Sequence, residues 1–337
     1  MKILVTGGAG FIGTHILVRL VESGYCPVVL DNFSNSSVKS LHKVEQIVEK
    51  KIDFLEGDIR DEEALSKLFS SNKFGAVIHL AGAKSISESV EKPLFYFENN
   101  VSGSLNLFKT MDKYEVRSIV FSSSATVYGI PKKLPLKESM PTSEPTNAYG
   151  ITKLMIEKNL QELYSRNKAW NIINLRYFNP IGAHKSGLIG EDPQGLPNNI
   201  MPYLTQVAIG KLNQLNIYGN DYKTHDGTGI RDYIHVMDLA NGHIKALQKL
   251  EKEKGIWNIN LGTGIGHSVL DLVKTFEKVT GKEIPYKLTD RRPGDIAISY
   301  TDPSFAKKEI NWVAEFSLDD MCEDSWRWQS MNPEGYD

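Results

Sequence analysis

Short apolar segments rich in β-branched residues alternate with longer amphipathic segments through the first half of the chain. Strands that alternate with helical patterns predict right-handed βαβ units, and therefore a parallel, doubly wound α/β sheet. We expect strands at residues 3–5, 27–30, 52–55, 76–80, 118–121 and 172–176, and helices at residues 12–23, 61–70, 94–114 and 148–166.

The pattern changes after Asn179. Residues 182–199 are rich in turn formers, and beyond them helix and strand patterns alternate irregularly. We therefore expect a boundary near Pro180, with a first domain of residues 1–180 and a smaller, mixed α/β second domain of residues 181–337. Residues 232–261 again have a strand, helix, strand pattern, which predicts that part of them packs back against the first sheet.

The composition excludes several classes of protein. With 41% hydrophobic residues the chain can bury a large core, and its net charge of -2 gives no basis for a nucleic acid or anionic membrane partner. Cys26 and Cys322 are the only cysteines and are far apart in sequence, so we expect neither a disulfide framework nor a metal site. No stretch approaches the roughly 20 apolar residues of a membrane span, and Gly7 interrupts the first apolar run before it could form a signal peptide. These features predict a soluble, cytoplasmic protein.

A glycine-rich segment follows the first predicted strand and opens the first predicted helix. Gly8–Gly13 matches the pattern G-x-G-x-x-G, and Gly7 adds an overlapping G-x-x-G-x-x-G. Glycines there let the backbone approach a pyrophosphate, whose charge lies at the positive end of the helix, as in Rossmann dinucleotide-binding folds. A tight turn without a ligand is the alternative.

Asp31 ends the next predicted strand, at the spacing where such folds place a carboxylate on the adenosine ribose. A carboxylate there also repels a 2′-phosphate, so the sequence favours NAD over NADP. The neighbouring Asn32, Asn35 and Ser36 are expected to share the ribose site. A solvated turn or a helix N-cap is the alternative.

Two further strand ends carry candidate cofactor residues. Asp58 and Ile59 follow the third strand, where both side chains can meet the adenine, and a turn Asp is the alternative. Ala81, Gly82 and Lys84 follow the fourth strand, on the side where open α/β sheets bind ligands. The small residues would let the cofactor pass close to the backbone, and Lys84 could reach a hydroxyl or a phosphate. A solvated surface lysine is the alternative.

Tyr149 and Lys153 are four residues apart on a predicted helix, so a phenol and an ammonium share one face. A free tyrosine has a pKa of about 10, and a nearby cation favours the phenolate, which suits Tyr149 to general acid/base catalysis near neutral pH. Lys153 would also hold the nicotinamide ribose. Residues 122–129, directly after the fifth strand, are rich in hydroxyls, and Ser124 can hydrogen-bond the substrate oxygen whose proton Tyr149 takes. Finding all three beside a glycine-rich loop argues against an accidental spacing.

Together these motifs resemble the extended short-chain dehydrogenase/reductase family, and within it the nucleotide-sugar 4-epimerases of the galactose pathway. The similarity runs nearly end to end, through residues 31–32, 56–59, 122–129, 175–180, 190–195, 197–199, 229–236, Asp238 and 291–295. The resemblance implies that NAD stays bound during turnover and that the substrates are UDP-hexoses, UDP-glucose and UDP-galactose. Tyr149 would take the proton of the sugar 4-hydroxyl while hydride leaves C4. The transient 4-keto sugar would then turn, and hydride would return to its other face.

The resemblance also implies which residues form the site. The cofactor site would comprise Gly7, Gly10, Phe11, Ile12, Gly13, Asp31, Asn32, Asn35, Ser36, Asp58, Ile59, Leu80, Ala81, Gly82, Lys84, Asn99, Ser122, Tyr149, Lys153 and Phe178. The substrate site would comprise Ser124, Tyr149, Asn179, Asn199, Asn216, Ile217, Tyr218, Arg231, Arg292, Asp295 and Ser299. Their chemistry agrees, because Arg231 and Arg292 can each bind phosphate through two hydrogen bonds and Tyr218 can stack on uracil. Without the family, each arginine would more often be a surface ion-pair partner.

Two other functions fit part of the pattern. A nucleotide-sugar 4,6-dehydratase shares the cofactor site and the Tyr/Lys pair, but that family has an Asp-Glu pair where this chain has Ala125 and Thr126, or at most Ser124 and Ala125. Neither pair offers a carboxylate, so elimination of water lacks its acid and base. A non-catalytic dinucleotide-binding protein has no use for Tyr149, Lys153 and Ser124 together.

The apolar stripes of residues 94–114 and 148–166 predict a homodimer joined by a four-helix interface, as the family's members form. Packing of both segments on their own sheet alone is the alternative.

One position predicts which sugars enter. In the family, a Tyr shortly after Asp295 goes with restriction to UDP-glucose and UDP-galactose, and here that position is Ser299, followed by Tyr300. The smaller side chain frees roughly the volume of an N-acetyl group, so we predict that UDP-N-acetylglucosamine and UDP-N-acetylgalactosamine are also interconverted. A Tyr300 that fills the gap, or a register shifted by one residue, is the alternative.

Overall fold

A seven-stranded parallel sheet forms the centre of the computed structural model, which describes residues 1–142, 144–195, 197, 199–292 and 294–336. The motif members Asn198 and Pro293 lie outside the described residues. From one edge to the other the strands are β10 (Ile256–Leu261), β6 (Asn171–Tyr177), β5 (Ser118–Ser124), β4 (Phe74–His79), β1 (Lys2–Thr6), β2 (Cys26–Asp31) and β3 (Asp53–Glu56). The strand order reverses between β1 and β4, as expected of a doubly wound sheet, so the predicted fold class is confirmed.

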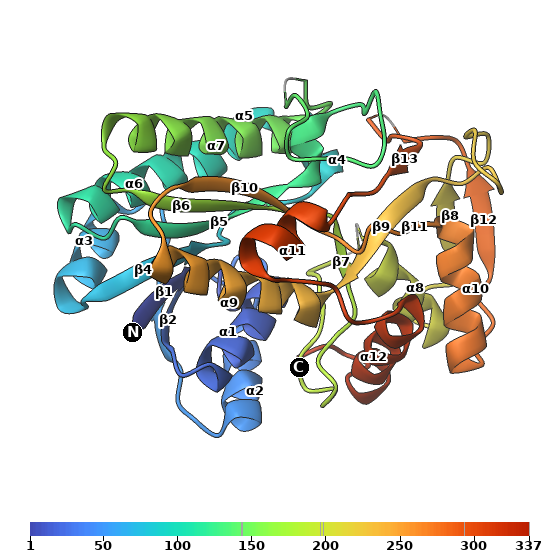
Figure 1. Cartoon of the computed structure of the whole chain (residues 1–337). Helices are drawn as coiled ribbons and strands as arrows, with labels where there is room; N and C mark the ends of the chain where they lie inside the picture. The colour runs from blue at the N-terminus through green and yellow to red at the C-terminus, as the bar shows by residue number, and fades with distance from the viewer. Residues whose placement is uncertain (143, 196, 198, 293, 337) are drawn as a thin grey trace.

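Helices cover both faces of this sheet (Figure 1). One face carries α3 (Glu62–Ser71), α6 (Gly103–Lys113) and α7 (Ala148–Arg166), and the other carries α1 (Phe11–Glu22), α2 (Val38–Val48) and α9 (Val236–Lys252). Successive side chains of a strand point to opposite faces, so Ile3 and Val5 pack in the core beneath α1 and α9, whereas Leu4 packs in the core beneath α3, α6 and α7. Burial on both faces explains why the central strands β1 and β4 are almost continuously apolar.

The helix predicted over residues 94–114 is divided into three parts. They are α5 (Pro93–Tyr96), a π-helix η1 (Phe97–Ser102) and α6. The periodicity of the apolar residues does not reveal this change of helical pitch. Two short helices, α2 and α4 (Ile86–Glu91), were not predicted, because each has few buried apolar residues. Side-chain caps from Ser37 and Ser85 begin them.

The second half of the chain forms a smaller lobe beside the carboxyl ends of the main strands (Figure 1). β9 (Ile230–His235) pairs with β7 (Asn179–Ile181), β11 (Gly266–Ser268) and β13 (Ile298–Ser299), and β8 (Leu215–Tyr218) pairs with β12 (Tyr286–Thr289). The apolar core of this lobe includes residues of α8 (Ile200–Ala208), α10 (Val269–Thr280) and α12 (Leu318–Met331), and α11 (Ser304–Ile310) contacts α9 and β10.

The chain returns from this lobe to the main sheet. After β9, helix α9 packs along α1, and β10 then pairs with β6 at the sheet edge. In the described part of the chain no helix is both long enough and apolar enough to cross a membrane.

Candidate active site

The glycine-rich loop connects β1 to α1 and leaves the start of that helix open. Gly7 has φ +72°, and a Cβ there would lie 2.7 Å from the backbone nitrogen of Ala81. A Cβ on Gly13 would lie 2.5 Å from the Gly7 oxygen, whereas one on Gly10 would meet only that oxygen, at 3.5 Å. Helix α1 begins after Gly10 without a side-chain cap, so its first-turn N–H groups are available to an anion. This open, uncapped cradle fits the pyrophosphate of a dinucleotide.

The Asp31 carboxylate fastens this loop to the loop after β2. Its Oδ2 accepts a hydrogen bond from the Ala9 N–H at 2.9 Å, and its Oδ1 accepts from the Phe33 N–H and the Ser36 hydroxyl, each at 2.9 Å. A carboxylate has about four acceptor sites, so one remains for a ribose hydroxyl. The sequence pattern predicts Asp31 at the ribose, but it gives no sign that Asp31 also holds the glycine-rich loop through the Ala9 N–H.

Asp58 lies next to these residues at the end of β3. It accepts from the side-chain amide of Asn32 at 2.8 Å and from the Arg60 guanidinium at 2.8 and 2.9 Å, and Arg60 lowers its pKa to about 2. Ile59 is buried in the core beneath α6, where a Cβ on Gly103 would touch it. The structure therefore brings Asn32 and Asp58 together, and it leaves Asn35 exposed.

Leu80, Ala81 and Gly82 follow β4 and run past the glycine loop. The N–H groups of Leu80 and Ala81 both donate to the Thr6 carbonyl at 3.0 Å. The π-helix η1 holds the next turn, because Asn100 bonds both the N–H and the carbonyl of Ala83, and its amide also donates to the Thr152 hydroxyl of α7. Asn99, a predicted cofactor residue, precedes Asn100 in the same π-helix and donates to its side chain at 3.0 Å.

Tyr149 and Lys153 start helix α7, and Ser124 ends strand β5. Asn147 caps the helix, which fixes the direction of its first turn. The Lys153 ammonium donates to the Ser122 carbonyl at 2.7 Å and lies 5.8 Å from the centre of the Tyr149 ring. Ser124 Oγ accepts from the N–H and hydroxyl of Thr126, and Ser124 lies close enough to Tyr149 to oppose the effect of burial on the pKa of that phenol. The residues predicted to be catalytic thus lie together at the carboxyl end of the sheet.

Burial dominates the acid–base properties of this group. It raises the pKa of the Tyr149 phenol above its usual value, and the hydrogen bond with Ser124 acts in the opposite direction. Burial lowers the pKa of Lys153 to about 8, and the nearby Glu157 carboxylate opposes this. Sequence reasoning considered only the attraction between phenolate and ammonium, whereas desolvation acts against the charged form of both groups.

Most of the substrate residues predicted between 216 and 295 lie around strands β8 and β12, whereas Arg231 lies on β9. The Arg292 guanidinium lies 4.7 Å from the centre of the Tyr218 ring, and its Nε donates to Asp295 at 3.1 Å. Asn216 also lies on β8, with its amide 3.5 Å from the Tyr203 hydroxyl. Ile217, which separates Asn216 from Tyr218 in the sequence, is buried. An exposed aromatic ring beside a guanidinium offers a surface on which a planar base could stack.

Arg231 and Ser299 are opposite each other on the parallel strands β9 and β13. Tyr300, the next residue after Ser299, packs toward β11 instead, since a Cβ on Gly266 would lie 3.4 Å from the Tyr300 ring. Phe178 and Asn179 follow β6, and Phe178 is buried while Asn179 is exposed.

Glu191 joins two predicted residues and was not itself predicted to be functional. Its Oε1 accepts from the Lys84 ammonium at 3.0 Å and from the Asn199 amide at 2.6 Å, while its buried Oε2 has no hydrogen-bond partner among the described residues. Trp328 and Tyr336 hold the backbone of this segment, through the Glu191 carbonyl and both backbone groups of Gly190. Motif spacing gives no signal for such a bridge, because Lys84 and Glu191 are 107 residues apart.

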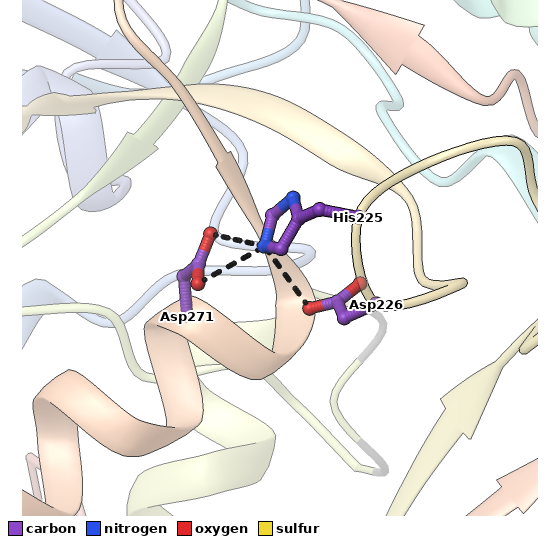
Figure 2. A group of neighbouring side chains, drawn as sticks. All are labelled: His225, Asp226 and Asp271. Atoms are coloured by element: carbon purple, nitrogen blue, oxygen red, sulfur yellow. Dashed lines mark hydrogen bonds and ion pairs between the residues drawn. The ribbon is translucent and has the colours of Figure 1, made fainter.

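Figure 2 shows His225, Asp226 and Asp271, the one group among the described residues whose atoms are close enough to hold a metal ion. His225 Nε2 lies 3.3 to 3.5 Å from the two carboxylates. Asp271 also completes the capping box of α10 with Ser268, and Asp226 accepts from the Ser268 hydroxyl. Capping and ion pairing therefore account for these side chains, and the positive end of a helix disfavours a cation.

Comparisons with known proteins agree with this geometry. Residues 4–325 match a family model described as GDP-mannose 4,6 dehydratase. The UDP-glucose 4-epimerase of Bacillus subtilis (strain 168) is 56% identical over 336 residues, which are 100% of this chain and 99% of that protein. The crystal structure of UDP-glucose 4-epimerase from Bifidobacterium longum in complex with NAD+ and UDP is 50% identical, with a TM-score of 0.98 over 99% of this chain and 100% of that one. The UDP-Glc/GlcNAc 4-epimerase of Campylobacter jejuni is 33% identical, with a TM-score of 0.84 over 98% and 99% of the two chains.

Replacement of Asp31 with Ala is expected to weaken NAD binding about ten- to hundredfold, because it removes a charged acceptor. The preference for NAD over NADP should also narrow, because the charge that repels a 2′-phosphate is lost. Asp31→Asn separates these effects, since the amide keeps an acceptor oxygen without the charge. Titration of nucleotide-free protein with both nucleotides measures the preference. An unchanged ratio of the two dissociation constants in both variants would contradict the assignment.

Proposed function

The chain belongs to the UDP-glucose 4-epimerases of the extended short-chain dehydrogenase/reductase family, and on that premise we propose that it interconverts UDP-glucose and UDP-galactose with a bound NAD. The observation that carries the proposal is the group formed by Tyr149, Ser124 and Lys153 at the same sheet edge as the uncapped start of α1. NAD, when bound, supplies the group that accepts hydride from the sugar C4 and returns it.

Residues of the chain itself would accept and return the proton of the sugar 4-hydroxyl. Tyr149 would take the proton of the sugar 4-hydroxyl and return it after the transient 4-keto sugar has turned. Ser124 can donate to the same sugar oxygen, because its Oγ already accepts from Thr126 and keeps its own proton to donate. Lys153, fixed on the Ser122 carbonyl, would stabilise the phenolate and hold the nicotinamide ribose. Proton transfer by a positioned side chain typically contributes about 10²–10⁴ in rate.

Elimination of water, the reaction in the description of the family model, is not favoured here. A dehydratase needs a carboxylate acid and base beside the reacting sugar, and residues 125 and 126 are Ala and Thr. The Thr126 hydroxyl donates to Ser124 and cannot replace a carboxylate. A non-catalytic nucleotide-binding role would not account for the grouping of Tyr149, Ser124 and the buried Lys153.

We propose that residues 1–180 hold the NAD and residues 181–337 hold the UDP-sugar, each through the residues predicted above. Arg231 and Arg292 would bind the diphosphate, and Tyr218 would flank the uracil. The contact of Arg292 with both Tyr218 and Asp295 supports this, because it places a base-sized surface and a phosphate-binding group side by side. The neighbouring Asn216 and Ile217 would complete the uracil site, and Asn179 and Asn199 the sugar site.

The N-acetylated UDP-hexoses are proposed as further substrates. Ser299 lies opposite Arg231, the proposed phosphate-binding residue, so the two side chains share one face of the sheet, which supports a place for Ser299 beside the substrate. Tyr300 packs toward Gly266 instead, which argues against the alternative that this ring fills the space beside the sugar. The Campylobacter jejuni relative is described as acting on both UDP-Glc and UDP-GlcNAc.

A cytoplasmic homodimer in galactose metabolism is the proposed setting. Large apolar side chains are exposed on neighbouring helices, with Val90 57%, Leu94 82% and Phe95 40% exposed near α4 and α5, and Met155 38% exposed on α7. Helices α4 and α5 both contact α7, so these side chains can form one patch. Burying such a patch against its copy would give the four-helix interface that the sequence predicts.

Tyr149→Phe tests the acid/base. The variant is expected to keep its fold and its NAD and to lose epimerase activity by a factor of about 10²–10⁴, because only the ionisable oxygen is removed. A coupled assay of UDP-galactose conversion measures the activity. The absorbance of the bound nucleotide measures the cofactor content and serves as the control. Turnover near that of the wild type would refute the role of Tyr149.

Ser299→Tyr tests substrate choice. The wild type is expected to turn over both UDP-glucose and UDP-N-acetylglucosamine, and the variant to lose activity on the second by about one to two orders of magnitude, since a phenol overfills the space for an acetamide. Tyr300→Phe is the matched control and should change neither activity. Rejection of N-acetylated sugars by the wild type would show the prediction to be wrong, and their acceptance by Ser299→Tyr would place the selective residue elsewhere.

Leu94→Glu tests the dimer. Sedimentation of the wild type should give about twice the chain mass of 37.8 kDa, and the variant should shift toward one chain because it buries a charge in the interface. Val313→Glu, at a position that is 53% exposed on the connection between α11 and α12, is the control and should remain dimeric. A monomeric wild type at micromolar concentration would contradict the proposal.

A further inference from the structure

A buried ion pair lies behind the proposed catalytic residues and takes no part in the chemistry derived above. Glu157 of α7 and Arg176 of β6 have side chains that are 6% and 3% exposed. The guanidinium binds the carboxylate through two hydrogen bonds, Nε to Oε1 at 3.0 Å and Nη2 to Oε2 at 2.7 Å. A buried pair of this kind is a weak source of stability, because desolvation of both charges offsets their attraction. Its presence beside a reaction centre therefore suggests another role.

The pair holds the Ser122–Ser124 strand end on both sides. The hydroxyl of Ser123, the residue before Ser124, donates to Glu157 Oε1 at 2.5 Å. Beyond Ser124, the Tyr128 hydroxyl accepts from Arg176 Nη1 at 2.8 Å and donates to the Asn260 side chain at 2.7 Å. Ser124 thus lies between two residues that this pair fixes, and its own Oγ caps the short helix Ala125–Tyr128.

The pair also sets the charge around Lys153. Glu157 is one helical turn from Lys153 on the same face of α7, and it is the group whose charge opposes the effect of burial on the pKa of that lysine. Glu138 is a further carboxyl in this group, since it interacts electrostatically with Arg176 and Tyr128, and burial raises its pKa. Burial lowers the pKa of His79 on β4 to about 3, and it raises the pKa values of Tyr149 on α7 and Tyr177 on β6. Arg176 is cationic but is turned to Glu157 and Tyr128.

We propose that Glu157 is a positioning residue of the epimerase, which keeps Lys153 in its charged form and fixes the strand end that carries Ser124, with Arg176 as its support. The inference rests on the proposed function, because it deepens the role of Lys153 in that reaction. Loss of the Glu157 carboxylate would remove a negative charge near Lys153 and would leave the positive charge of Arg176 uncompensated. Both changes favour the neutral form of the Lys153 amine. Lys153 would then give up its proton at a lower pH.

The pH dependence of kcat for UDP-galactose, measured on the NAD-containing enzyme, tests this. Glu157→Gln is expected to lower kcat at neutral pH by about tenfold or more, through misplacement of Ser124 and Lys153, with a smaller change in KM. The alkaline limb of the kcat–pH profile of Glu157→Gln is expected to lie about 1 pH unit below that of the wild type. Glu309→Gln is the matched control, since Glu309 pairs with the buried Lys249 away from the site, and its pH profile should not move. Wild-type activity on UDP-galactose is measured first, so failure of the proposed function is recognised before any variant is compared.

A second variant covers the case in which Glu157→Gln does not fold. The double replacement Glu157→Met with Arg176→Met removes both charges and keeps an apolar filling, so it is expected to fold. Its alkaline limb should lie between those of the wild type and Glu157→Gln, because the carboxylate and the uncompensated guanidinium are both absent. A folded, NAD-containing Glu157→Gln with the wild-type pH profile overturns the proposal. So does a double variant with the wild-type profile and wild-type kcat, which would reduce the pair to a structural role.

Discussion

The close approach of two backbones, at Gly7 and Ala81, organises the rest of this molecule. Both segments leave the sheet at the point where the strand order reverses, and a Cβ on Gly7 would lie 2.7 Å from the Ala81 nitrogen. This contact holds the loop after β4 against the glycine-rich loop, at the same sheet edge where the uncapped first turn of α1 begins. Because parallel strands end on one side, the Ser122–Ser124 segment of β5 arrives at that edge as well. The phosphate cradle and the proposed proton-transfer group are therefore consequences of one topological reversal.

Sequence reasoning was most successful where local chemistry determines the structure. Helix α7 occupies the predicted residues 148–166, because an Asn cap begins it and its apolar face packs on the sheet. The six predicted strands are all present, with ends that differ by at most three residues. The residues expected around the glycine loop, Tyr149 and Tyr218 lie in groups that hydrogen bonds or ring contacts connect.

What the sequence could not predict depends on contacts between distant segments. Glu191 meets Lys84 and Asn199 only because the second lobe folds over the end of β4, and no periodicity records that meeting. The acid–base balance at Tyr149 depends on burial, which is a property of the whole fold and opposes the attraction expected from a neighbouring lysine. The hydrogen bond from the Ala9 N–H to Asp31 could not be predicted for a similar reason, because it joins residues 22 positions apart.

The π-helix η1 also restricts how this chain can vary in length. A π-turn holds one residue more than the α-helical turn it replaces, and each residue of an α-helix advances the chain by about 100° around its axis. Because the wider turn absorbs the extra residue, deletion of a single residue between Phe97 and Ser102 would restore a regular helix and leave the segments before and after it at nearly the same relative rotation. A deletion inside α6 would instead turn everything after it by that angle. The π-turn holds Asn100, which bonds both backbone groups of Ala83, so loss of the extra residue would displace this contact while α6 kept its orientation. A one-residue difference in length is therefore tolerated by the helix that follows and is felt at the loop after β4.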